Sequence, residues 1–290
     1  MPGGGDNLHQ QAVELGARLV GRPVTALYAR GVTHAALVGE VVTSVQAHGR
    51  HLLIGVGDSM RLHVHLGTHG RLRVGPRAAL SLATAARASL VIVTEDVAAV
   101  WSNAHSVEML RSASLHEHPL LSSLGPDVLE STFDAGQVVA RARARPPETT
   151  IGEMMLDQGV VAGVGNAYRN EVLFLERVDP WTPVARLGDE ALAAVYGRAR
   201  ALMQAQLAPA QQGGGARGVG WDRDRPKGAR PHVYRRRGRP CHVCGTPIAL
   251  EPQGLPPRST YFCPRCQGRR APSEASAPAR AHAGERERRR

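Results

Sequence analysis

Four cysteines near the carboxyl end constrain the fold of this chain most strongly. Cys241, Cys244, Cys263 and Cys266 form the pattern C-x2-C-x18-C-x2-C. Each C-x2-C pair can present two thiolates from one tight turn, and two such turns facing each other make a tetrahedral zinc site. All four ligand positions are then filled by the protein, so the expected zinc is structural and not catalytic. In a reducing compartment this pairing favours a metal over disulfides.

The segment between the two cysteine pairs, GTPIALEPQGLPPRSTYF, predicts a hairpin that the metal would hold together. Arg258 is expected near its tip or on its returning strand. A guanidinium in that place can bind a phosphate with two hydrogen bonds or enter a nucleic-acid groove. The plain alternative is an exposed arginine on a basic protein.

The charge balance favours a polyanionic partner. Lysine and arginine outnumber aspartate and glutamate 36 to 25, which gives a formal charge of +11 and a pI near 10.6. DNA or RNA is the first candidate, although the terminal GERERRR supplies part of this charge. No segment approaches the roughly 20 apolar residues of a membrane span, and no secretory signal is evident. We therefore expect a monomer in the cytoplasm, associated with the nucleoid and not with a membrane.

Apolar periodicity divides the chain into a β-rich part and a helical part. After a helix expected over residues 7–21, short runs such as HLLIGVG, RLHVHLG and SLVIVTED predict strands separated by turns. They indicate a two-layer sandwich with the helix at one end. The turn residues LGPD end this part, and helical spacing begins near residue 134.

These patterns predict an α+β fold with four units. Residues 1–125 form the N-terminal helix and β-sandwich, and residues 134–230 form a helical domain that ends in a flexible, glycine-rich loop over 209–230. Residues 231–270 form the cysteine-bearing hairpin. Residues 271–290 cannot bury apolar area and are expected to be disordered.

A glycine turn between two helical runs, QGVVAGVGNAYRNEVLFL, is the second informative motif. Gly163 and Gly165 permit a close backbone approach, and Asn166 stands where a helix N-cap is expected. Free N–H groups at a helix N-terminus form a natural phosphate site. An ordinary helical hairpin would show the same residues.

The amino-terminal stretch MPGGGD precedes the first helix directly. Its glycines have no preferred conformation, and Asp6 is placed to accept a hydrogen bond from the first turn of the helix as an N-cap. On these residues alone, the stretch is a flexible start followed by a cap.

The motifs occur together in one order that resembles a known family. An N-terminal helix and sandwich are followed by TIGEMMLDQGVVAGVGNAYRNEVLF, then by GRPCHVCGTPI and PPRSTYFCPRCQ. This closely resembles the formamidopyrimidine-DNA glycosylase and endonuclease VIII family of base-excision repair enzymes, over about residues 2–270. The resemblance implies a helix-two-turn-helix at the glycine turn and a zinc hairpin. It also implies double-stranded DNA with a damaged base or abasic site as partner, kinked between two domains with the damaged nucleotide flipped out.

The resemblance also assigns roles to individual residues. Asn166 with its turn, and Arg258 of the zinc hairpin, would bind phosphates beside the lesion. Glu171 would support the turn or lie near the lesion pocket. In the family, the amine of an N-terminal proline attacks the sugar and forms a Schiff base, which makes Pro2 the candidate nucleophile and the protein a DNA glycosylase and abasic-site lyase.

The chain departs from the family pattern at its catalytic positions. The family begins Pro-Glu-Gly-Asp, whereas here the glutamate position holds Gly4 or, in the other alignment, Gly3. Arg50 in GRHLL stands where the family has a lysine. It keeps the charge and can bind a DNA phosphate, but it cannot transfer protons. Thr68 replaces a methionine that many members insert into DNA.

Two hypotheses follow from these departures. The first is a working glycosylase and lyase that uses Pro2, with Asp6 as the nearest substitute acid. The second is a non-catalytic protein that binds lesions or DNA structures on the same scaffold. A plain zinc-ribbon transcription or RNA-binding protein is disfavoured, because the ribbon arrives with the complete preceding architecture.

Overall fold

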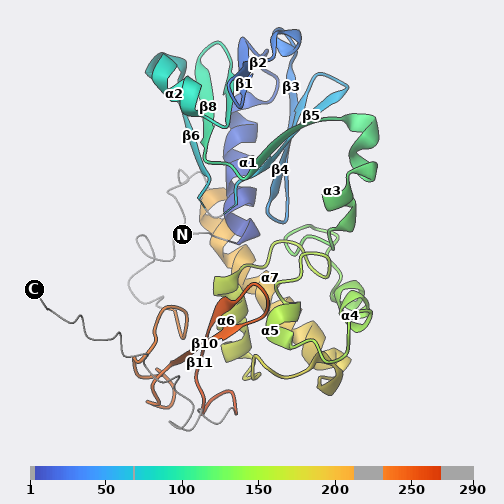
Figure 1. Ribbon diagram of the computed structural model, residues 1–290, viewed down its shortest axis with the longest axis vertical. Coiled ribbons are helices and arrows are strands. Elements are labelled where there is room, and N and C mark those ends of the chain that lie inside the picture. Colours follow the sequence, from blue (N-terminus) through green and yellow to red (C-terminus); the bar gives the residue numbers. More distant parts are fainter. Residues whose placement is uncertain (1–3, 68, 212–230, 269–290) are drawn as a thin grey trace, which may run out of the picture.

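The computed structural model describes residues 4–67, 69–211 and 231–268 (Figure 1). The predictions made for Pro2, Thr68 and the tail over 271–290 fall outside these ranges, as does nearly all of the loop predicted over 209–230. Within the described ranges, none of the helices combines the length and apolar character needed to cross a bilayer.

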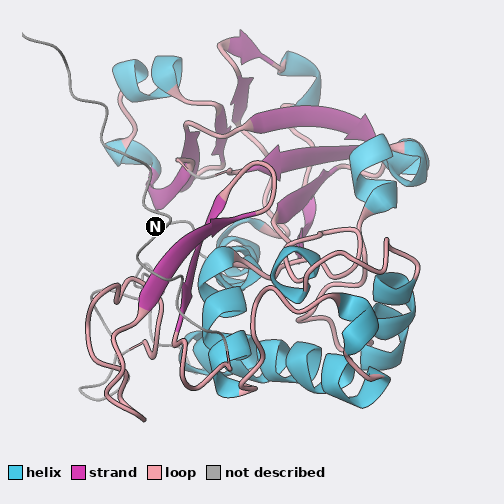
Figure 2. Cartoon of the chain, turned by 60° about the horizontal axis from the view of Figure 1, so that its bottom comes forward, coloured by secondary structure: helices cyan, strands magenta, loops and turns pink. Residues whose placement is uncertain are grey.

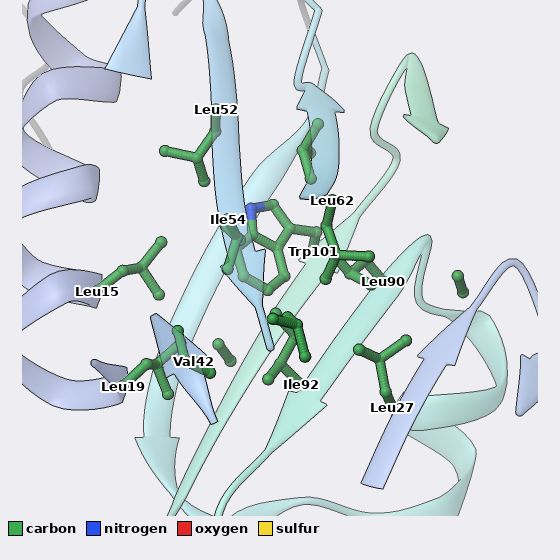
Figure 3. Close-up of a cluster of buried hydrophobic side chains, with 14 of the residues drawn as sticks. Leu15, Leu19, Leu27, Val42, Leu52, Ile54, Leu62, Leu90, Ile92 and Trp101 are labelled. Carbon is green, nitrogen blue, oxygen red and sulfur yellow. The ribbon is translucent and has the colours of Figure 1, made fainter. Parts of the chain in front are cut away.

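Two antiparallel sheets form the amino-terminal part. Side chains from both sheets meet in one core, in which Trp101 is fully buried among leucine, isoleucine and valine side chains (Figure 3). One sheet has the spatial order β2 (Val32–Thr33), β1 (Ala26–Ala29), β7 (Leu90–Val93), β8 (Val97–Ser102) and β6 (Arg71–Pro76). The other has the order β3 (Val42–His48), β4 (His51–Val56), β5 (Met60–His65) and β9 (Ser106–Arg111).

Helix α1 (Gly5–Leu19) closes this sandwich and connects it to the helical part. Its buried Leu8, Ala12, Leu15 and Leu19 recur at helical spacing and belong to the sandwich core. It also lies against α7, the long helix of the other part (Figure 1). The amino-terminal helix is therefore shared between the two halves of the protein.

The helical part has its own core and lies below the sandwich in Figure 1. Its helices are α4 (Ala135–Arg143), α5 (Ile151–Met154), α6 (Asn166–Leu175) and α7 (Asp189–Gln211). The side chain of Asp134 caps α4 by accepting a hydrogen bond from the Gly136 N–H at 2.8 Å. The glycine turn occupies the segment between α5 and α6, as the sequence predicts.

A two-stranded hairpin follows, formed by β10 (Ala249–Gln253) and β11 (Arg258–Phe262). Figure 2 shows it lying across the helices with its turn directed toward the sandwich. Its base packs beside the four cysteines in a small separate core. Arg258 opens the returning strand, in agreement with the sequence prediction.

The α+β class, the sandwich and the hairpin are confirmed, whereas several short elements were not anticipated. Strand β9 was not anticipated, because SVEMLR has a central Glu108 and precedes an expected break. The break also contains short helical turns. The unpredicted short helices are η1 (Ala35–Leu37), η2 (Arg77–Ala79), α2 (Leu82–Arg87), η3 (Ser112–Glu117), α3 (Pro119–Ser123) and η4 (Val184–Arg186).

Candidate nucleic-acid interface and metal centre

The start of α1 lies at the junction of the two halves, in direct backbone contact with two turns. The Gly5 N–H donates to the Gly163 carbonyl oxygen at 2.7 Å. A Cβ atom on Gly5 would lie 2.5 Å from the Gly49 carbonyl oxygen and 2.9 Å from the Gly163 Cα atom. Gly163 has a φ of +105°, which side chains disfavour. Glycine is thus required where α1, the β3–β4 turn and the glycine turn meet.

Asp6 is buried in this junction and binds the helix of the other half. Its Oδ2 accepts a hydrogen bond from the Tyr168 hydroxyl at 2.6 Å, and its residue is 2% exposed. Burial raises the pKa of Asp6, although the Tyr168 bond acts in the opposite direction. The expectation that Asp6 is the N-cap is wrong: the cap position is Gly4, which makes no side-chain cap bond. Among the described residues, no group hydrogen-bonds to its Oδ1.

Asp127 fixes the β3–β4 turn through its side chain, and the predicted site did not include this residue. Its Oδ2 accepts hydrogen bonds from the Gly49 N–H at 2.6 Å and from His9 Nε2 at 2.7 Å. Burial opposes the charge on Asp127, but these bonds outweigh it and lower its pKa. The carboxylate therefore anchors the turn that carries Arg50. The turn motif LGPD was the available sequence indication.

Arg50 and Arg258 are far apart in the sequence but lie close enough in the structure for their positive charges to repel each other. Burial lowers the pKa of Arg50, and the positive charge of Arg258 lowers it further. Arg50 is partly buried beside the junction, whereas Arg258 is exposed at the hairpin turn. A phosphate bound beside both arginines would relieve this repulsion and could accept hydrogen bonds from each guanidinium.

Asn166 joins the same region through the hairpin. Its Nδ2 donates to the Ser259 carbonyl oxygen at 2.9 Å, next to Arg258 in the chain. The N-cap of α6 is Gly165, so the prediction that Asn166 fills this position is wrong. Asn166 is the first helical residue and its amide holds the strand that begins with Arg258. The structure therefore brings together Arg50, Asn166 and Arg258.

Arg169 was missed by the sequence analysis and lies fully buried between α6 and the hairpin. Its guanidinium donates to Thr260 Oγ1 at 2.6 Å and to the Ser259 carbonyl oxygen at 3.0 Å. Burial, followed by the charge of Arg258, lowers its pKa to about 10. Asn170 adds a hydrogen bond from the Tyr261 N–H to its Oδ1 at 2.7 Å. The polar pair Arg169 and Asn170 within this helix was the sequence feature that could have predicted a buried polar contact with the hairpin.

Glu171 supports the chain that enters the cysteine module. Its carboxylate accepts hydrogen bonds from the N–H groups of His232, Val233 and Tyr234 at 2.7, 2.9 and 2.8 Å. Burial opposes its charge, yet these bonds and one from the His232 side chain lower its pKa. The resemblance implied that Glu171 supports the glycine turn or lies near the lesion pocket, whereas its hydrogen bonds hold residues 232–234 instead.

The four cysteines converge on one point. Their Sγ atoms all lie within 4.8 Å of one another, with 3.9 Å between Cys241 and Cys266 and 3.4 Å between Cys244 and Cys263. Tetrahedral Zn–S bonds of about 2.3 Å require sulfur separations of about 3.8 Å. The Val243 and Cys266 N–H groups each donate to a sulfur at 3.4 Å, which favours thiolates. This donor set fits a metal ion.

A group of histidines lies on the outward face of the four-stranded sheet, beside Arg50. His51 Nδ1 and His63 Nε2 are 2.9 Å apart, and His118 Nε2 is 2.7 Å from a Glu108 oxygen. Burial is the main cause that lowers the pKa of His51 to about 3 and of His65 to about 4. These two imidazoles are therefore neutral at pH 7. The alternation in RLHVHLG places His63 and His65 on one face, but it did not predict their burial.

Two family models decide the relationship of this chain to known proteins. The model described as the formamidopyrimidine-DNA glycosylase N-terminal domain matches residues 8–104, and that of the H2TH domain matches residues 124–216. The chain belongs to the formamidopyrimidine-DNA glycosylase family. Relatives of this glycosylase family member include "Probable endonuclease 8 2" of Streptomyces coelicolor, 34% identical over 92% of this chain and 95% of the relative. "DNA-(apurinic or apyrimidinic site) lyase Nei2" of Mycolicibacterium smegmatis is 32% identical over 91% and 98%.

Solved structures of the glycosylase family share the fold. A complex of Lactococcus lactis Fpg with DNA containing an abasic site has a TM-score of 0.74 and 22% identity, over 91% of this chain and 99% of that chain. A complex of the same protein with DNA containing Fapy-dG has a TM-score of 0.73 over 90% and 98%. The similarity extends over about nine-tenths of this chain.

Proposed function

We propose that this protein acts in base-excision DNA repair as a DNA glycosylase and abasic-site lyase. It would act as a monomer on chromosomal DNA in the cytoplasm, on duplexes that carry a damaged base or an abasic site. The observation that carries the proposal is the convergence of Arg50, Asn166 and Arg258 next to the start of α1. Membership of the glycosylase family supports the same activity.

Phosphate binding is assigned to the two arginines and the glycine turn. Arg50 and Arg258 supply charge from opposite halves of the protein, so a DNA backbone held by both would lie across the junction. Asn166 holds the Arg258 strand through its bond to the Ser259 carbonyl oxygen. Neutralising phosphates with these side chains releases counterions and makes the affinity depend on salt.

The chemistry is assigned to Pro2 and Asp6. The Pro2 amine would attack the C1′ atom of the damaged nucleotide, and the bond from C1′ to the base would break with its electron pair leaving on the base. The proline nitrogen passes its N–H proton to the departing base. A proton delivered to the sugar ring oxygen then opens the ring by breaking the C1′–O4′ bond, which leaves an iminium ion between C1′ and the proline nitrogen. Burial raises the pKa of Asp6, which favours the protonated form that could donate in this step.

The four cysteines would hold a structural zinc ion. With four thiolates the metal has no position left for water, so the site would support folding and not the reaction. Its role would be to hold the chain at the base of the β10–β11 hairpin and so keep Arg258 in place. Metal analysis of the purified protein is expected to give one zinc per chain, and Cys263→Ser is expected to lose it together with DNA binding.

Borohydride trapping on an abasic-site duplex tests the chemistry, because only a Schiff base is reduced to a covalent adduct. The native protein is expected to form the adduct. A matched control carries a cleavable peptide ahead of Pro2, which removes the free proline amine; the adduct should be absent before cleavage and appear after it. An adduct that forms equally with the peptide in place would exclude Pro2 as the nucleophile.

The second candidate function is lesion binding without catalysis, and one observation favours it. The family glutamate is absent after Pro2, and Arg50 occupies the lysine position. General acid and base groups contribute about 100- to 10,000-fold each in rate. Tight binding to the abasic duplex without any trapped adduct would establish this alternative. If an adduct does form, Asp6→Asn tests the acid, because it should slow trapping only if Asp6 delivers a proton.

The phosphate contacts are tested by salt dependence. Arg258→Ala is expected to weaken duplex binding and to lower the slope of log K against log salt by about 0.9, the value for one phosphate contact. Arg87→Ala is the matched control, because Arg87 is exposed on α2 at the far end of the sandwich (Figure 1). Equal slopes in both variants would contradict the assignment of Arg258.

A further inference from the structure

Leu255 at the turn of the β10–β11 hairpin is almost completely exposed. Its residue is 98% exposed, whereas the other large apolar residues exposed in the described ranges reach at most 62%, at Val243. Water penalises an apolar side chain in this position, and burial of Leu255 in a partner would remove that penalty. The hairpin presents Leu255 with no protein surface against it.

The hairpin turn is held firmly by Gln253, the last residue of β10 before the turn. Gln253 pairs with Arg258 in the strand register, which leaves residues 254–257 as the turn. Gln253 is 5% exposed and donates to Thr150 Oγ1 and to the Pro180 carbonyl oxygen, both at 2.8 Å. The two prolines that follow Leu255 restrict the backbone further. Because Gln253 is anchored and the prolines restrict the turn, less conformational entropy is lost when Leu255 inserts into a partner.

The positive charge near Leu255 indicates what kind of partner could take up this side chain. Arg258 lies three residues after Leu255, and its charge acts on both Arg50 and Arg169. An exposed apolar tip with an exposed arginine three residues away fits a ligand that is apolar inside and anionic outside. A DNA duplex has this arrangement, with stacked bases between two phosphate backbones, and proteins that kink DNA insert leucine or proline side chains between its base steps.

We propose that Leu255 inserts between stacked bases of the bound duplex as an apolar wedge, while Arg258 holds the adjacent phosphate. This rests on the proposed function of DNA binding and adds a residue that distorts the DNA. Insertion at one base step separates neighbouring bases and kinks the duplex, which lowers the energy needed to turn a damaged nucleotide out of the stack. Leu255 is then a positioning residue that acts through the shape of the DNA.

The test uses 2-aminopurine, whose fluorescence rises when it loses stacking, placed beside an abasic-site analogue in a duplex. The full-length protein is expected to raise this fluorescence. Leu255→Ala should bring it back to the value of the free duplex and weaken binding by about tenfold, with the salt slope unchanged. Leu255→Met, which keeps a long apolar side chain, should restore both. Val243→Ala is the matched control, since Val243 is exposed in the same module but outside the hairpin turn.

The outcomes separate this proposal from the one it rests on. If Leu255→Ala keeps the fluorescence rise while Arg258→Ala weakens binding, Leu255 is not a wedge and the DNA interface stands. If neither variant differs from the native protein, the interface itself is misplaced and the wedge fails with it. Loss of the signal in Leu255→Ala alone, with normal binding in Val243→Ala, supports insertion.

Discussion

Acidification is expected to destabilise the sandwich through the buried imidazole of His51. Burial, with the charges of His65, His63, His48 and Arg50, lowers its pKa to about 3, whereas the unfolded chain has the ordinary value near 6.5. Between these two values the unfolded state binds a proton that the folded state does not, so the free energy of unfolding falls as the pH falls. At pH 5 the solution is about 1.5 units below the pKa of His51 in the unfolded chain. Between pH 7.5 and 5 the free energy of unfolding should therefore fall by about 2 kcal/mol, at 1.36 kcal/mol per unit.

Urea unfolding at the two pH values measures this loss. Trp101 is fully buried in the sandwich core, so a protein with Trp181→Phe and Trp221→Phe reports on that part alone. His51→Gln in this background should lose about 2 kcal/mol less than its parent between pH 7.5 and 5. His116→Gln is the control, because the His116 side chain is 75% exposed.

A single result would refute the reasoning. If His51→Gln and its parent lose the same free energy between the two pH values, burial of His51 does not set the acid response. Asp6, whose pKa is raised by burial, is present in both proteins and cancels in the comparison. Asp127 and Glu108 have pKa values below their ordinary range and lose their contribution only at lower pH. They are also common to both proteins.

Three further substitutions test the junction and the cysteine module. Gly5→Ala should destabilise the protein by about 2–3 kcal/mol in calorimetry, because its Cβ atom would strike the backbone of the β3–β4 turn; an unchanged melting temperature would contradict the close approach. Glu171→Gln should cost about 2 kcal/mol and speed hydrogen exchange at residues 232–234, since an amide cannot accept all of their bonds. Tyr168→Phe should raise the pKa of Asp6 further, as followed by NMR of the carboxyl carbon, because the lost bond lowers that pKa.

Local sequence patterns predicted the structural features that depend only on neighbouring residues or on a fixed spacing. Alternating apolar runs predicted the strands of the sandwich, and the spacing of the four cysteines predicted their convergence. Glycine at 163 predicted a close backbone approach, which is made to Gly5 and Gly49. Each of these features depends on neighbouring residues or on a strict spacing, which a sequence displays directly.

Long-range polar contacts could not be predicted in the same way. Asp6 and Asn166 looked like helix caps, since a short polar residue before a helix usually serves that purpose. Tertiary partners instead take both side chains: the Tyr168 hydroxyl binds Asp6, and the Ser259 carbonyl oxygen binds Asn166. The buried Arg169 was missed for the same reason, because its partners lie on a hairpin that begins some eighty residues later.

Glu171 has a consequence for how this protein can change over evolution. Its carboxylate fixes residues 232–234 directly to helix α6. Loss of this carboxylate would displace the hairpin and Arg258 together, although Glu171 itself is buried away from any ligand. Substitutions at this position are therefore expected to be rare among variants that keep DNA binding.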